Sequence, residues 1–269
     1  MPSLELDPGT LSFEAFGDAA APGLFLIHGL HGDSASVRPL AERLAERFHV
    51  IAPDMLGHGE SERLDAFTLD DQATALNQLI VHYGYPEAHV VGYSMGSYIA
   101  ARAAIQEPDH VQRLVLVCPK AAGTTSSTVT AAERAGIDPE TASADDLMAA
   151  LQQAIWSSAT DADRRREILA VVNQAENLSR KERRANEESI EGFDLRAGLP
   201  TVTARTLVLS GAEDGLNPPE SGREVAGLVP GARFEVYERS GHMLPYEEPE
   251  RFAADVTAFL TEGLSLIHI

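Results

Sequence analysis

The stretch Gly92-Tyr93-Ser94-Met95-Gly96 decides how this chain is interpreted. It follows the apolar run Ala88-His89-Val90-Val91 and precedes a small-residue stretch with helix-forming character, Ser97–Gln106. Gly-x-Ser-x-Gly between a strand and a helix is the nucleophile elbow, a turn so tight that the residues two before and two after the serine cannot carry side chains. The strained backbone lifts the hydroxyl clear of the sheet, and the following helix N-terminus favours developing negative charge. We therefore predict that Ser94 is a nucleophile.

Downstream of this turn, two segments supply candidate partners for the serine in a consistent order. Asp214 lies in Gly211-Ala212-Glu213-Asp214, directly after an apolar run, and His242 lies in Ser240-Gly241-His242 after the next one. Imidazole, with an ordinary pKa of about 6.5, suits the removal of a serine proton, and a carboxylate fixes its tautomer. The order Ser94, Asp214, His242 predicts a catalytic triad. Glu213 remains an alternative to Asp214 as the acid.

Apolar runs of strand length alternate with helical patterns along most of the chain, which predicts a mainly parallel sheet covered on both faces. The expected strands are 4–7, 11–16, 24–27, 50–52, 90–91, 114–117, 206–209 and 234–237. The expected helices of this α/β pattern are 35–46, 69–83, 95–106, 221–228 and 249–260.

The alternation stops between about residues 121 and 198, where no strand is evident and four helices are expected, several opened by Ser, Asp or Thr caps. They are 130–135, 144–156, 161–177 and 180–190. Open α/β sheets bind ligands at the carboxyl ends of their strands, so a helical block there predicts a cap over the site. We expect an α/β core of residues 1–119 and 200–263 and a helical cap of residues 120–199.

The last residues, 264–269, are predicted to be a non-native tail. They follow the polar end of a helix and resemble one reading frame of a transposon-end adaptor used in sequencing libraries, which suggests a metagenomic gene. Cys118, the single cysteine, rules out an internal disulfide; it is interpreted as a small buried strand residue or as the floor of the pocket.

Composition excludes several classes of partner. The net charge of −20 argues against nucleic acid and anionic membrane surfaces, and reflects either a GC-rich genome or a saline habitat. No apolar run approaches the roughly 20 residues of a membrane span, and Met1–Asp7 has no secretory pattern, so a cytoplasmic location is expected. The charge run Arg180–Arg184 is expected to form a solvated helix face.

The segment His28-Gly29-Leu30-His31-Gly32 follows the first strand of the alternating series. A tetrahedral intermediate needs two backbone N–H donors for its oxyanion, and we assign them to Leu30 and Met95. His28 and His31 lack carboxylate or cysteine partners at metal-ligand spacing, so no metal is expected. His28 is predicted to brace the loop. The Gly-rich turn Pro53–Ser61 resembles a phosphate cradle only superficially, because it lacks the lysine and the spacing of a P-loop.

These residues together resemble the α/β-hydrolase superfamily, and specifically its capped esterase, lactonase and C–C hydrolase group. The resemblance covers roughly residues 24–118 and 206–260 and implies an eight-stranded, mainly parallel sheet, no cofactor and an acyl-enzyme route. A serine at position 94 argues against the dehalogenase and epoxide hydrolase branches, which use aspartate. Enol-lactonases resemble the elbow better than C–C hydrolases do, because Tyr93 stands where the latter often have asparagine.

The leading interpretation is a serine hydrolase acting on a small-molecule carboxylic ester or lactone. A C–C hydrolase of ring-cleavage products and a cofactor-free perhydrolase are alternatives on the same site, and a ligand receptor of this fold is an alternative of another class. Candidate substrate contacts are His31, Tyr93 and Trp156. Arg164–Arg166 are candidates to meet a carboxylate on the substrate, although most arginines are expected to be solvated.

Overall fold

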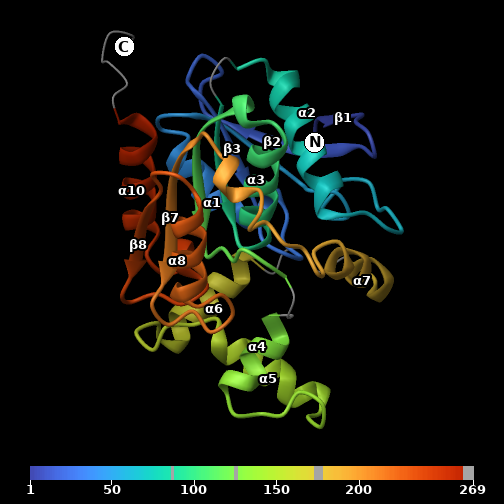
Figure 1. Ribbon diagram of the computed structural model, residues 1–269, viewed down its shortest axis with the longest axis vertical. Helices are drawn as coiled ribbons and strands as arrows, with labels where there is room; N and C mark the ends of the chain where they lie inside the picture. Colours follow the sequence, from blue (N-terminus) through green and yellow to red (C-terminus); the bar gives the residue numbers. More distant parts are fainter. Residues whose placement is uncertain (86–87, 124–126, 173–177, 263–269) are drawn as a thin grey trace.

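One mixed sheet of eight strands runs through the part of the chain that this computed structural model describes, residues 1–85, 88–123, 127–172 and 178–262 (Figure 1). The strand order is β1-β2-β4-β3-β5-β6-β7-β8; the β1–β2 and β2–β4 pairs are antiparallel and the other pairs are parallel. The mostly parallel eight-stranded sheet is thus confirmed. The strands are β1 (Ser3–Leu4), β2 (Leu11–Phe16), β3 (Gly23–Ile27), β4 (His49–Pro53), β5 (Ala88–Tyr93), β6 (Val111–Val117), β7 (Arg205–Gly211) and β8 (Arg233–Tyr237).

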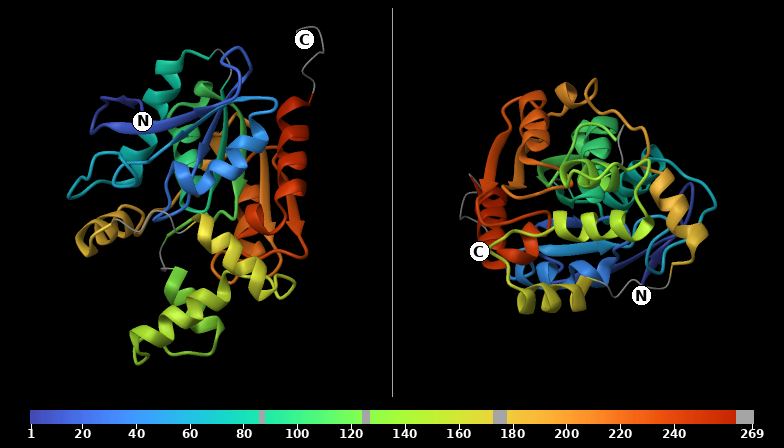
Figure 2. Two further views of the ribbon diagram at one scale, coloured as in Figure 1. Left: turned by 180° about the vertical axis from the view of Figure 1, so that it is seen from behind. Right: turned by 90° about the horizontal axis from the view of Figure 1, so that it is seen from below.

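Helices cover both faces of this sheet, and for that reason β3, β4 and β5 are buried at every position (Figure 2). One face packs against α2 (Leu69–Tyr83), α3 (Met95–Gln106) and α8 (Pro219–Leu228). The other packs against α1 (Ser34–Leu44) and α10 (Pro249–Thr261). Shorter elements are η1 (Pro108–His110), η3 (Leu199–Thr201) and α9 (Leu244–Glu247), which the sequence did not predict.

Four helices separate β6 from β7: α4 (Ser127–Arg134), α5 (Ala144–Ala154), α6 (Ala162–Val172) and α7 (Arg180–Glu188). We call residues 127–172 and 178–188 the helical insert. Figure 1 shows α4, α5 and α6 beyond the carboxyl ends of the strands, with α4 and α5 packed on each other and α6 packed against α1. The part of the expected helix 161–177 beyond residue 172, and the predicted tail 264–269, lie outside the described residues.

Ser caps expected for the helices of the insert are present at α5 and α7, and Thr68 caps α2 in the same way. Thr68, Ser143 and Ser179 each accept a hydrogen bond from the third residue of α2, α5 and α7, and in each case the side chain of that third residue accepts one in return. These reciprocal bonds explain why the boundaries of these helices were predictable. Among the described residues, no helix is both long enough and apolar enough to cross a membrane.

Candidate active site

Ser94 lies at a strained turn between β5 and α3. Its backbone has φ 52° and ψ −118°, a conformation that non-glycine residues rarely adopt. A Cβ on Gly92 would lie 2.2 Å from the Gly96 carbonyl oxygen, and a Cβ on Gly96 would lie 2.4 Å from the Ile27 carbonyl oxygen. Both positions therefore require glycine. The turn leaves Ser94 partly exposed while its neighbours are buried.

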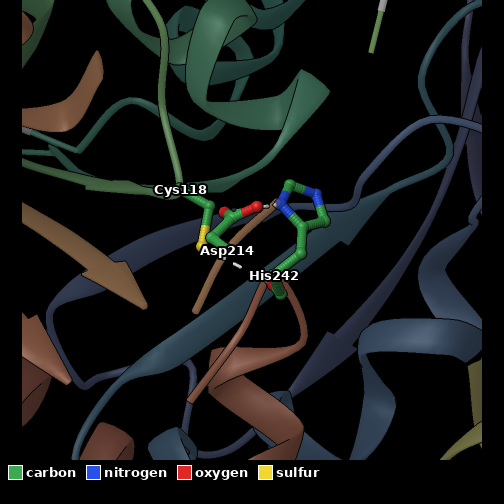
Figure 3. Close-up of side chains that lie close together, drawn as sticks. All are labelled: Cys118, Asp214 and His242. Carbon is green, nitrogen blue, oxygen red and sulfur yellow. Dashed lines mark hydrogen bonds and ion pairs between the residues drawn. The ribbon is translucent and has the colours of Figure 1, made fainter. Parts of the chain in front are cut away.

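The loops after β7 and β8 bring an acid and a base to this serine. The Nε2 atom of His242 lies 2.9 Å from the Ser94 hydroxyl oxygen, and its Nδ1 atom lies 2.8 Å from Asp214 Oδ2. Because Nδ1 faces a carboxylate, it carries the imidazole proton and Nε2 is left to accept the hydrogen bond from Ser94. The structure thus joins the three predicted residues into one chain of hydrogen bonds. Figure 3 shows Asp214 and His242 side by side.

Asp214 is held by its own loop. Its Oδ1 atom accepts hydrogen bonds from the backbone N–H groups of Leu216 and Asn217, both at 2.9 Å. The Asn217 amide in turn donates to the Tyr98 hydroxyl at 2.6 Å and to the Cys118 carbonyl at 2.8 Å. Asn217 was not predicted from the sequence, because its partners belong to α3 and to the end of β6 and become its neighbours only through folding.

The neighbouring acid, Glu213, turns away from His242. Its carboxylate accepts hydrogen bonds from the Ser157 hydroxyl at 2.9 Å and from the Ser158 backbone N–H at 2.8 Å, both in the helical insert. The Ser158 backbone N–H and the two serine hydroxyls lower the pKa of Glu213. Of the two acids considered from the sequence, Asp214 is the one in contact with the imidazole.

Cys118 lies at the end of β6, behind Asp214 and His242 (Figure 3). It is fully buried, and its thiol lies 3.5 Å from the His242 carbonyl oxygen. Potential ligand atoms of Cys118, Asp214 and His242 all lie within 4.8 Å of one another. Burial raises the pKa of the Cys118 thiol well above its usual range, and Nδ1 of His242 bonds Asp214.

The loop His28–Gly32 lies against the elbow and is held by its first histidine. The Nδ1 atom of His28 donates to the Gly29 carbonyl at 2.8 Å, and its Nε2 atom accepts from the Met55 backbone N–H at 3.0 Å. Burial lowers the pKa of His28, which favours the neutral ring that this pattern requires. His28 thus braces the loop, as predicted.

The turn Pro53–Ser61 also has a structural role. Asp54 accepts hydrogen bonds from the backbone N–H groups of Ser34 at 2.6 Å and Glu60 at 2.8 Å, so it ties this turn to the start of α1. Its carboxylate is thereby fully committed to backbone donors, and the turn presents no anion cradle of the P-loop type.

A cavity of about 370 Å³ opens beside the elbow. It contains three of the predicted site residues, Leu30, His31 and Tyr93. The described residues that line it are Gly29, Leu30, His31, Gly32, Ser36, Tyr93, Val172, Arg183, Met243 and Tyr246.

The other expected substrate contacts, Trp156 and Arg164–Arg166, are not among the described residues that line this cavity. Trp156 is buried, with the Arg165 guanidinium 5.7 Å from its ring centre. Arg164 donates to the Tyr246 carbonyl, Arg165 to the Ser157 carbonyl, and Arg166 pairs with Asp163. These arginines hold the insert together or face solvent.

Comparison with known proteins agrees with this geometry. A family model of the α/β hydrolase fold matches residues 22–249, and the chain therefore belongs to the α/β hydrolase fold family. The chain is 28% identical over 268 residues to the sn-1-specific diacylglycerol lipase ABHD11 of Mus musculus, covering 95% of this chain and 87% of the relative. It is 30% identical over 251 residues to the pimeloyl-(acyl-carrier protein) methyl ester esterase of Vibrio cholerae, covering 88% and 94%.

Solved structures show the same fold. The enol-lactonase from Burkholderia xenovorans superposes with a TM-score of 0.83 at 24% identity, covering 97% of this chain and all of that one. The esterase from Exiguobacterium antarcticum superposes with a TM-score of 0.81 at 20% identity, covering 96% and 98%. This protein is thus a member of a hydrolase family whose relatives include a lipase and a methyl ester esterase.

Proposed function

We propose that this protein is a serine hydrolase that cleaves a carboxylic ester or lactone through an acyl-enzyme intermediate. The observation that carries the proposal is the unbroken hydrogen-bond chain from Ser94 through His242 to Asp214, at a strained turn that exposes the serine hydroxyl. The named activities of the relatives, a lipase and a methyl ester esterase, support ester bonds as the target.

The reaction follows from the donors and acceptors in place. Ser94 Oγ attacks the carbonyl carbon while His242 Nε2 takes the hydroxyl proton, and Asp214 stabilises the imidazolium that forms. His242 then returns the proton to the leaving alcohol oxygen as the carbon–oxygen bond breaks. A water molecule, deprotonated by the same nitrogen, attacks the acyl-enzyme and releases the carboxylic acid and free Ser94.

The oxyanion of each tetrahedral intermediate would be held by two backbone N–H groups. Met95 is the first residue of α3, so its N–H lacks an intrahelical acceptor and lies at the positive end of the helix dipole. Leu30 lines the cavity beside the elbow, and its N–H is the second donor. Neither role depends on the side chain, so substitutions of Leu30 or Met95 that leave the backbone in place should retain activity.

The helical insert is proposed to act as the cap. Val172 at the end of α6 and Arg183 on α7 line the cavity opposite the loop His28–Gly32. The volume of about 370 Å³ is at the small end of the range for ligand sites, which favours small acyl and alcohol groups.

The test is hydrolysis of a p-nitrophenyl ester series by the wild-type protein and by Ser94→Ala, with Ser221→Ala as a matched control on α8. We expect turnover of the short esters by wild type and by Ser221→Ala, and a loss of at least about 10⁴-fold in Ser94→Ala. A fluorophosphonate should add covalently to Ser94 in wild type and in Ser221→Ala, and should not label Ser94→Ala. Turnover that survives in Ser94→Ala would refute the proposal, and a well-folded wild type without turnover would favour C–C hydrolysis or a receptor role.

A further inference from the structure

Arg183 is the only side chain with a permanent charge among the described residues that line the cavity. The other lining positions are glycines, apolar or aromatic residues, a serine and a histidine. Arg183 is half-buried, although it belongs to the charge run Arg180–Arg184 that the sequence indicates to be a solvated helix face. The periodicity of α7 explains the difference, because Arg183 precedes the buried Asn186 by three residues and so lies on the same face of the helix.

The Arg183 guanidinium forms no ion pair with the described residues. Its one hydrogen bond joins Nε to the Leu178 carbonyl at 3.3 Å, and both terminal nitrogens are left without a protein partner in the described chain. Its neighbours on α7 behave differently. Lys181 pairs with Asp65 at 2.6 Å and Arg184 pairs with Glu188 at 2.6 Å, each at the exposed surface.

Among the described residues around Arg183, the nearest negative charge is that of Glu187; burial raises the pKa of this carboxyl, and the guanidinium lowers it without forming an ion pair with it. His31 lines the same cavity, and burial lowers its pKa, so the ring is mainly neutral at neutral pH. Glu187 Oε1 lies 3.6 Å from His31 Nε2, but more than half of the Glu187 side chain is exposed. In a protein with a net charge of −20, an arginine that forms no ion pair with the described residues and lines a cavity beside the elbow is an unusual placement that calls for an anionic ligand.

We propose that Arg183 forms a carboxylate subsite, so that the preferred substrates are esters or lactones that carry a second, free carboxylate away from the scissile bond. The inference rests on the proposed function, which places the scissile carbonyl at the Leu30 N–H in this same cavity. The planar guanidinium offers two parallel N–H donors that match a carboxylate. A dianionic phosphate fits less well, because a single guanidinium balances only one negative charge and Glu187 lies close by.

The experiment compares each acidic ester with its neutral amide. Monomethyl adipate carries the carboxylate on the acyl side and 4-acetoxybutanoate carries it on the alcohol side; the matched neutral esters are methyl adipamate and 4-acetoxybutanamide. Hydrolysis is followed by proton release in wild type, in Arg183→Gln and in the neighbouring control Arg184→Gln. We expect wild type to prefer at least one acid over its amide. Arg183→Gln should raise KM for that acid by about 10- to 100-fold, with kcat and the amide kinetics little changed.

Binding provides a readout that does not depend on turnover. Ser94→Ala, with and without Arg183→Gln, is titrated with the same four compounds and observed by ligand NMR. Tighter binding of an acid than of its amide, lost by about 10- to 100-fold in the Arg183→Gln double variant, supports the subsite. The inference fails if wild type hydrolyses acids and amides equally well, or if Arg183→Gln and Arg184→Gln have the same effect. If no ester is hydrolysed yet Arg183 still selects the acid in binding, the proposed function fails and the subsite stands.

Discussion

The α/β core and the helical insert are held in place by different forces. Core strands such as β3 and β5 are buried at every position, and α3 buries most of its residues. In the insert, α5 and α6 each bury a single residue, Ala150 and Ile168, and Met148 leaves about half of its surface exposed. Apolar burial thus organises the core, and it contributes far less to the insert.

Polar contacts of the short segment Ser157–Thr160 join the insert to two carboxylates of the core. Glu247 accepts hydrogen bonds from the Ser157 backbone N–H at 2.9 Å and the Thr160 hydroxyl at 2.6 Å, and Glu213 accepts from Ser157 and Ser158. Glu247 also accepts from the Gly241 backbone N–H at 2.6 Å, next to His242. The same carboxylate therefore positions both the insert and the loop of the base. The comparison teaches that the residues of the proposed triad and eight of the ten described lining residues belong to the core, whereas the insert, held more by polar contacts, contributes Val172 and Arg183 to the cavity.

The largest expected effect is a loss of kcat on substitution of the acid of the proposed triad, Asp214. Asp214→Asn should lower kcat for ester hydrolysis by about 10⁴-fold, since an amide no longer selects the tautomer of His242 that can accept the Ser94 proton. Glu213→Gln is the matched control and should keep kcat within a few-fold, because Glu213 contacts the insert. Steady-state kinetics of both variants check this. Equal losses in the two variants would contradict the assignment of the acid.

The next largest expected effect is a loss of folding stability where a new side chain would clash with the backbone of the core. Gly96→Ala places a methyl group against the Ile27 and His28 carbonyl oxygens, so unfolding should become easier by about 3 kcal/mol or more. Gly136→Ala in the insert meets no atom within 4 Å and should cost only about 1 kcal/mol, through its φ of +72°. Urea unfolding measures both. Gly227→Ala, next to the last residue of α8, meets no atom within 4 Å and should be neutral or slightly stabilising. A loss of stability in Gly227→Ala as large as that in Gly96→Ala would show that the loss at Gly96 does not come from its close packing.

The attachment of the insert should depend on Glu247. Glu247→Ala leaves three donors without their carboxylate and should lower stability by about 2 kcal/mol, with a drop in kcat because the Gly241–His242 loop is released. Glu250→Ala removes only the exposed pair with Arg43 and should change stability by less than about 0.5 kcal/mol. Thermal unfolding and ester turnover of the two variants are compared. Identical behaviour would show that the insert is attached by something other than these bonds.

The smallest expected effect depends on pH. Hydrogen bonds from Ser158 and Ser157 lower the folded pKa of Glu213 below its ordinary value of 4.5. The contribution of Glu213 to stability is therefore present above about pH 4.5 and is lost as pH falls through the lower folded pKa. It should not exceed about 1 kcal/mol, because the group is largely exposed. The difference in melting temperature between wild type and Glu213→Gln should shrink on acidification; a difference that grows at low pH would reverse the assigned sign.

Much of the fold and the three residues of the proposed triad could be predicted because their signals are local. Continuous apolar strands, reciprocal caps such as Thr68, and glycines at positions 92 and 96 each reflect a constraint within a few residues. The chain order of Ser94, Asp214 and His242 then placed all three at the same edge of the sheet, since carboxyl ends of parallel strands share one edge.

Other assignments needed the folded chain. The choice between Asp214 and Glu213, the burial of Trp156, and the support that Asn217 gives to Asp214 all depend on which loops meet in space. Adjacent residues in a loop point in different directions, and nothing in the composition of Gly211–Asp214 says which carboxylate faces the imidazole.

From the sequence alone one could predict a mostly parallel α/β sheet, the position of the nucleophile and the class of chemistry to expect. These predictions were possible because secondary-structure periodicity and the tight turn at Ser94 depend on residues that are close together in the chain. Tertiary structure alone decided that Arg183 faces the cavity while Arg184, beside it in the same charge run, pairs with Glu188 at the surface. One residue along a helix is a turn of about 100°, so the packing of α7, and not its composition, selects which arginine a substrate meets.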